Sequence, residues 1–215
     1  MPPRKQAPPR AWQRMLSGRR LDLLDPSPMD IELEDIAHGL ARVARWNGQT
    51  TGGHAFSVAQ HSLLVERIAS ALRPDLSRRW RLAALLHDAP EYVVGDLITP
   101  FKAAIGLDYR ELEGRLLRAV HIRFGLPGEI PKTITALVKR ADKMAAFLEA
   151  TRLAGFSEPE ARRFFTAPRG LPERELVKIR NIKPLPATEA QNLFIARFEE
   201  LIERKKSPAV QAPQE

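Results

Sequence analysis

The chain has 215 residues, of which 44% are hydrophobic and 28% charged, enough for one soluble globular domain with a hydrophobic core. Its longest unbroken aliphatic stretch, Leu82 to Leu86, is far too short to span a bilayer. No apolar segment follows the basic N-terminus, so no secretory signal is predicted. The absence of cysteine excludes disulfides, thiolate metal sites and a cysteine nucleophile. We therefore expect a cytoplasmic protein without a membrane partner.

The net charge of +8 is concentrated at the N-terminus. Residues 1–20 carry six basic and no acidic side chains, whereas the other 195 residues carry 28 basic and 26 acidic groups. We expect this proline-rich arm to be disordered and solvated, with contact to a polyanion as the alternative interpretation. A nucleic-acid partner is not expected for the domain itself.

The remaining chain reads as one domain over residues 21–205, followed by a disordered tail over 206–215 that is again rich in proline. Residues 21–33 are predicted to be extended, with a turn at 25–28. Helical spacing of apolar residues and helix-capping signals predict helices over 36–46, from 57 onward, and over 77–92, 108–124, 131–148, 158–165 and 188–205. The fold class is therefore an all-α bundle with a short extended N-terminal segment.

His87 and Asp88 follow directly after the apolar run Leu82 to Leu86. Polar groups that emerge from a core helix are costly to bury unless something satisfies them. Imidazole and carboxylate together suit a divalent ion such as Mn²⁺, Co²⁺, Zn²⁺ or Mg²⁺. For an isolated pair, the alternative is a histidine at a helix end with a capping acid.

Two further residues strengthen the metal interpretation. His61 and Asp142 each lie within a predicted helix, near its apolar side. Together with His87 and Asp88 they could converge from three helices, which is how bundles build metal sites. Each also has a structural alternative: a core histidine bonded to a carbonyl for His61, and a surface salt bridge to Lys139 or Lys143 for Asp142.

Four segments in this order resemble the HD-domain phosphohydrolases, in particular the branch of bacterial 5′-deoxynucleotidases and phage dATP triphosphohydrolases. The segments are Val58-Ala59-Gln60-His61-Ser62-Leu63, Leu85-Leu86-His87-Asp88-Ala89-Pro90-Glu91, Gly95-Asp96-Leu97-Ile98-Thr99-Pro100-Phe101-Lys102 and Ala141-Asp142-Lys143. The resemblance covers roughly residues 35–150. It implies an HD-domain bundle, one divalent metal ion held by His61, His87, Asp88 and Asp142, and a homodimer.

The resemblance also implies roles for the neighbouring residues. Glu91 would transfer a proton as general acid or base. Arg45 would orient the phosphate through its forked guanidinium, and Trp46 would crowd the 2′ position of the sugar, with Arg42 as an alternative phosphate contact. Asp96 would accept a hydrogen bond from the 3′-hydroxyl, while Thr99 and Lys102 would contact the substrate. The alternatives are a solvated acid for Glu91, an exposed arginine and a core tryptophan for Arg45 and Trp46, and a turn at Asp96.

The leading functional hypothesis is hydrolysis of deoxyribonucleoside 5′-monophosphates to deoxynucleoside and phosphate. A triphosphohydrolase that releases tripolyphosphate shares the same metal site, and extra cations near the pocket would favour it. A non-catalytic nucleotide- or nucleic-acid-binding module is the third hypothesis, and only the basic arm favours it. His38 and His121 are expected to be structural, and His54 to lie in a loop.

Overall fold

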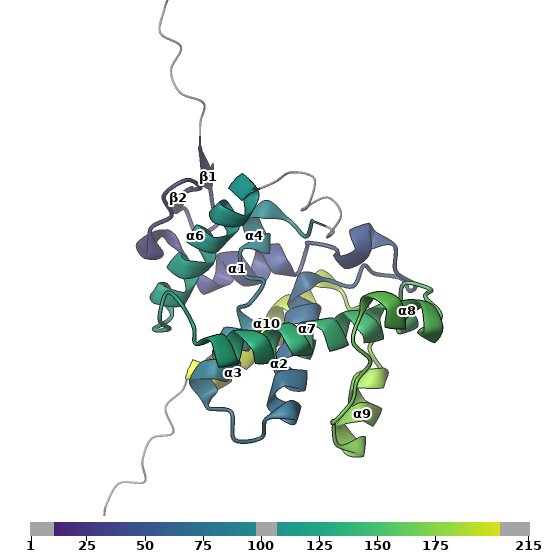
Figure 1. The fold of residues 1–215 in the computed structure, drawn as a ribbon. Helices are drawn as coiled ribbons and strands as arrows, with labels where there is room; N and C mark the ends of the chain where they lie inside the picture. Colours follow the sequence, from purple (N-terminus) through teal and green to yellow (C-terminus); the bar gives the residue numbers. More distant parts are fainter. Residues whose placement is uncertain (1–10, 98–106, 203–215) are drawn as a thin grey trace, which may run out of the picture.

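The computed structural model describes residues 11–97 and 107–202, and helices dominate this part of the chain (Figure 1). The longer helices are α1 (Leu33–Leu40), α2 (Val58–Leu72), α3 (Arg78–Leu85), α6 (Leu107–Arg123), α7 (Lys132–Arg152) and α10 (Ala187–Ile202). The shorter elements are β1 (Trp12–Arg14), β2 (Arg20–Asp22), the 3-10 helices η1 (Pro28–Asp30) and η2 (Arg45–Gly48), α4 (Glu91–Val94), α8 (Glu158–Phe164) and α9 (Glu173–Arg180). The predicted all-α fold is confirmed. None of the helices in the described ranges is long and apolar enough to cross a membrane.

Helix α2 joins the two main parts of the hydrophobic core. It packs against α3, α7 and α10, and Figure 1 shows α7 crossing it. Its first turn, with Val58 and Ala59, belongs to the cluster that includes α1 and α10. Its later turns, with Val65 and Ile68, belong to the cluster that it shares with α7. A side chain on α2 can therefore face α3 and α7 together, which is the arrangement that the site requires.

Helix α2 begins as predicted, because the Ser57 side chain accepts a hydrogen bond from the Gln60 amide. The helix expected over 36–46 is instead α1, which ends at Leu40. The chain beyond it is extended at Ala44, and Trp46 and Asn47 have positive φ angles of 58° and 50°. Neither conformation can continue a right-handed helix.

The helix predicted over 77–92 is interrupted. Helix α3 ends at Leu85, and a turn over 86–90 separates it from α4. Pro90 accounts for the break, because proline has no amide hydrogen and its ring clashes with the carbonyl four residues earlier. His87 and Asp88 therefore lie in a turn between two helices.

Residues 11–20 correct the prediction of a disordered arm over 1–20. Strands β1 and β2 form an antiparallel pair in which Gln13 lies opposite Leu21. Leu21 is fully buried, and the carboxylate of Asp35 on α1 accepts hydrogen bonds from the Ser17 amide and hydroxyl. A buried leucine and a paired acid thus hold this segment against the domain.

Some predictions lie outside the described residues. Thr99 and Lys102 fall within 98–106, and the tail over 206–215 falls within 203–215. Helix α9 was not predicted. Ile179 is its single buried residue, and Leu176 packs partly buried against the cluster that α2 shares with α7. These are too few apolar positions for a helical period to be recognised.

Glu66 links three helices through a buried carboxylate. It accepts hydrogen bonds from Arg81 on α3, Arg197 on α10 and Ser70 on its own helix. Burial disfavours its ionised form, but these donors outweigh that effect, so the pKa of Glu66 is lowered. A lowered pKa in the folded state stabilises the protein above the ordinary glutamate pKa, and this contribution is lost as the pH falls through the lowered value.

We expect Glu66→Gln to reduce the free energy of unfolding by about 1–3 kcal/mol at neutral pH, because two arginines lose a charged acceptor. The difference from wild type should shrink as the pH is lowered below about 4.5, the ordinary pKa of glutamate. Denaturant unfolding at neutral pH and at the lower pH measures this difference in the free energy of unfolding. Glu175→Gln, which removes the exposed Arg67–Glu175 pair, is the matched control and should have a much smaller effect. Equal effects of the two substitutions would contradict the structural role of Glu66.

Candidate metal centre

Three separate segments bring four predicted ligand residues together. His61 lies in the second turn of α2, His87 and Asp88 in the turn after α3, and Asp142 in the middle of α7. His61 Nε2 lies 3.3 Å from Asp88 Oδ2 and 3.2 Å from Asp142 Oδ1. His87 Nε2 lies 3.1 Å from the same oxygen of Asp88. The potential ligand atoms of His61, His87 and Asp88 all lie within 4.8 Å of one another.

The hydrogen bonds on the outer side of each imidazole define which nitrogen faces the centre. The Glu149 carboxylate lies 2.5 Å from His61 Nδ1, and the Ala84 carbonyl lies 2.9 Å from His87 Nδ1. Because a carboxylate and a carbonyl can only accept, each Nδ1 carries the proton. The Nε2 atoms of both histidines are buried and have no hydrogen-bond partner among the described residues. Two imidazole nitrogens held in this way beside two carboxylates fit a divalent cation.

Glu149 is the site residue that the sequence analysis missed. It is fully buried on α7 and accepts hydrogen bonds from His61, from Arg45 Nε and from the Trp46 indole. A carboxylate behind a metal-binding histidine orients the ring and increases its basicity. The signal was available, because Glu149 follows Asp142 by seven residues, which is two helical turns and returns to the same face.

The ionisable groups at the centre strongly perturb one another. Burial and the charge of Arg45 disfavour the charged form of His61, but the carboxylates of Glu149, Asp142 and Asp88 outweigh them and raise its pKa well above the ordinary value. Burial opposes ionisation of Glu149, yet Arg45 and His61 lower its pKa to about 2. Burial likewise opposes ionisation of Asp88, but the two histidines hold its pKa well below its usual range. Asp88 is therefore kept ionised, as a carboxylate ligand for a cation must be.

Arg45 and Trp46 lie beside the centre, although not as free side chains. Arg45 donates to Glu149 at 3.2 Å and to Asp96 at 3.0 Å. Trp46 donates from Nε1 to Glu149, and its ring packs against Phe156 and Phe165. Both side chains therefore hold contacts within the protein. The roles expected of them, orienting the phosphate for Arg45 and crowding the 2′ position for Trp46, stay predictions.

The other predicted site residues are divided between the centre and distant surfaces. Glu91, the first residue of α4, is 2% exposed, which excludes the solvated acid considered above, and its charge helps to raise the pKa of Arg45. Asp96 is bonded to Arg45. Arg42 instead binds the His38 carbonyl and Gln191 of α10. His54 is exposed in its loop.

A cavity of about 440 Å³ opens onto the centre. His87 and Asp142 contribute to its wall, together with Lys139 one turn before Asp142 on α7. His121, expected to be structural, also lines it and is buried. The cavity gives a small molecule access to the candidate metal ligands.

The fold and the site together define an all-α protein built around a candidate centre for one divalent cation. Residues 58–146 match the model of the HD domain. An uncharacterised protein of Rhodobacter capsulatus is 61% identical over 193 residues, covering 90% of this chain and 96% of the relative. The chain belongs to the HD-domain family.

Two further similarities are more distant. The uncharacterised Escherichia coli protein YfdR is 29% identical over 177 residues, covering 82% of this chain and 88% of the relative. The solved structure of the cyanophage S-2L HD phosphohydrolase DatZ, bound to dA and one catalytic Zn²⁺ ion, shares 19% identity with a TM-score of 0.47. The match covers 80% of this chain and 96% of the DatZ chain.

We expect Glu149→Gln to weaken divalent-metal binding about 10- to 100-fold, because the amide keeps the shape of the side chain but loses the charge behind His61. Isothermal titration calorimetry with Mn²⁺ or Zn²⁺ measures the affinity, and thermal unfolding verifies that the variant is folded. Glu160→Gln, an exposed change on α8, should leave the affinity unaltered. A folded Glu149→Gln protein with wild-type affinity would contradict the orienting role.

Proposed function

We propose that the protein is a metal-dependent phosphohydrolase that removes the 5′-phosphate of deoxyribonucleoside 5′-monophosphates. The observation that carries this proposal is the pair of buried Nε2 atoms of His61 and His87, which have no hydrogen-bond partner within the described ranges and lie beside the carboxylates of Asp88 and Asp142. The cavity that reaches His87 and Asp142 supplies room for a substrate. The choice of a deoxynucleotide comes from the sequence resemblance around Arg45 and Trp46.

In this proposal one divalent ion would be held by His61, His87, Asp88 and Asp142. The donor atoms are compatible with Mn²⁺, Co²⁺, Zn²⁺ and Mg²⁺. Such an ion polarises a phosphoryl oxygen and lowers the pKa of a bound water. Glu149 keeps His61 in the tautomer whose Nε2 faces the site. The ionised state of Asp88 and Glu149 counterbalances the positive charges of the centre and of Arg45.

Glu91 is the proposed proton carrier. It is buried, and it is close enough to Arg45 for their charges to interact. A buried carboxylate near the reacting phosphate can donate a proton to the leaving sugar oxygen, or accept one from the attacking water. Arg45, fixed between Glu149 and Asp96, then places a positive charge beside the phosphate.

The monophosphate is favoured over a triphosphate by the position of the cations. Arg42, whose proximity would favour a triphosphate, is bound to His38 and Gln191. Among the described residues that line the cavity, Lys139 is the single lysine or arginine. Lys139 together with Arg45 would supply two positive charges, which suit a single phosphate better than the more highly charged chain of a triphosphate.

Purified protein loaded with each of the four metals should release orthophosphate from deoxynucleoside monophosphates, and more slowly from ribonucleotides. Asp142→Ala should lower kcat/KM by about 100-fold or more, because a ligand of the ion is lost. Asp75→Ala, which removes an exposed carboxylate, is the matched control and should retain activity. Tripolyphosphate as the product would favour the alternative reaction, and no hydrolysis with any metal would refute the proposal.

A further inference from the structure

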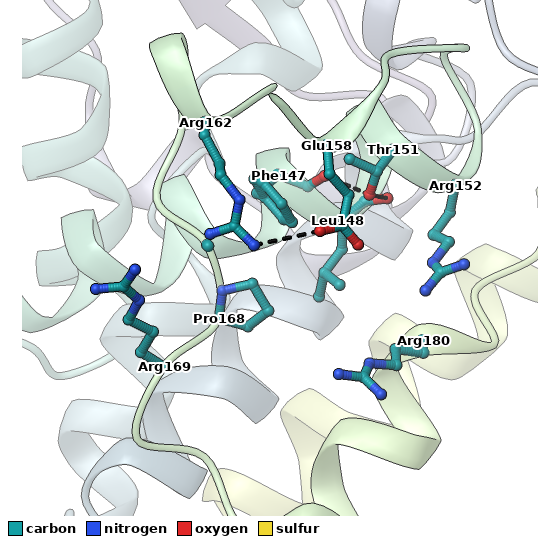
Figure 2. A pocket seen from close by; sticks show the side chains of 10 residues that line it. Phe147, Leu148, Thr151, Arg152, Glu158, Arg162, Pro168, Arg169 and Arg180 are labelled. Carbon is teal, nitrogen blue, oxygen red and sulfur yellow. Dashed lines mark hydrogen bonds and ion pairs between the residues drawn. The ribbon is translucent and has the colours of Figure 1, made fainter. Parts of the chain in front are cut away.

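A second cavity, of about 210 Å³, lies on the far side of α7 from the metal centre. At about 100° per residue, Glu149 lies on the same face of α7 as Asp142, whereas Phe147 and Thr151 point to the opposite face. Phe147 and Thr151 line this cavity together with residues of α8, α9 and the segment between them (Figure 2). None of the candidate metal ligands is among its lining residues.

Arginine side chains dominate this cavity. The lining holds four arginines and a single acid, Glu158, so it carries a net charge of +3. The arginines are Arg152 of α7, Arg162 of α8, Arg169 between α8 and α9, and Arg180 of α9. Figure 2 shows the guanidinium groups of Arg152 and Arg180 extending from their helices into the hollow. Four separate segments therefore contribute positive charge to the lining of one cavity.

Three of these arginines have no acidic partner among the described residues. Arg162 pairs with Glu158 at 3.2 Å. For the side chains of Arg152, Arg169 and Arg180, no ion pair or hydrogen bond is found within residues 11–97 and 107–202. Six other arginines are paired with carboxylates, namely Arg19, Arg45, Arg67, Arg81, Arg123 and Arg197. Like charges gathered without a counter-charge repel one another, and an anion relieves that repulsion.

We propose that this cavity binds a chain of linked phosphate groups, as carried by a nucleoside triphosphate or by tripolyphosphate, without a metal ion. Guanidinium groups bind phosphate oxygens through paired hydrogen bonds. The three unpaired arginines come from three segments, and a triphosphate carries enough charge to match the net charge of +3. The volume of about 210 Å³ is below the roughly 300–1,000 Å³ of sites that enclose a whole organic ligand, so the base and sugar of a nucleotide would remain outside.

The test is calorimetric titration of the full chain with sodium tripolyphosphate at low salt, in the presence of a chelator that removes metal from the other site. The double variant Arg169→Ala/Arg180→Ala should bind about tenfold more weakly than wild type, because charge-assisted hydrogen bonds are lost. The matched control is Arg163→Ala/Arg174→Ala. It removes two exposed arginines of α8 and α9 that do not line the cavity, and it should bind within about twofold of wild type.

Parallel titrations identify the source of the phosphate. With dATP, binding should show the same dependence on Arg169 and Arg180, while dAMP and orthophosphate should bind at least about tenfold more weakly because they carry less charge. Equal losses in the two double variants, or no binding of tripolyphosphate by wild type, would overturn the proposal. Binding of a single-stranded oligonucleotide through these arginines, without binding of tripolyphosphate, would also overturn the proposal. Circular dichroism verifies that both variants are folded, and since no metal is present, the outcome does not depend on the hydrolytic function.

Discussion

The hydrogen bond between Glu149 and His61 is the interaction on which the centre depends. Both residues are fully buried, so each needs the hydrogen bond to the other to hold its orientation. The same carboxylate also accepts from Arg45 and Trp46, which joins α2, α7 and η2 at one point. The orientation of the metal-facing nitrogen and the position of the neighbouring cation therefore have a common origin.

This arrangement also explains the irregular backbone near the site. Trp46 and Asn47 adopt left-handed conformations, which are costly for residues other than glycine. The indole that this backbone places is held by Glu149 at its nitrogen and by Phe156 and Phe165 at its ring. A strained segment persists when the surrounding contacts determine its position more strongly than its own preferences do.

Helix α7 separates two regions of opposite electrostatic character. On one face, Asp142 and Glu149 belong to a centre where carboxylates and cations balance. On the other, arginines of α7, α8 and α9 gather around a hollow with one acid among them. In the metal centre burial makes each charge dependent on a partner, whereas the arginines of the second region are exposed and can keep their charge without one.

The sequence by itself determined the helical class of the fold, the start of α2 at the Ser57 cap and the identity of four potential ligands, because periodicity, capping and residue chemistry are local properties. Only the tertiary structure decided that α3 ends before His87, that Glu149 lies behind His61, and that Arg45 is shared between two carboxylates. The tertiary structure also decided which side chains of residues 147–180 surround one cavity, although the sequence already gives their charges. Such partnerships join residues up to 104 positions apart in the chain, and they depend on how helices pack, which no local pattern encodes.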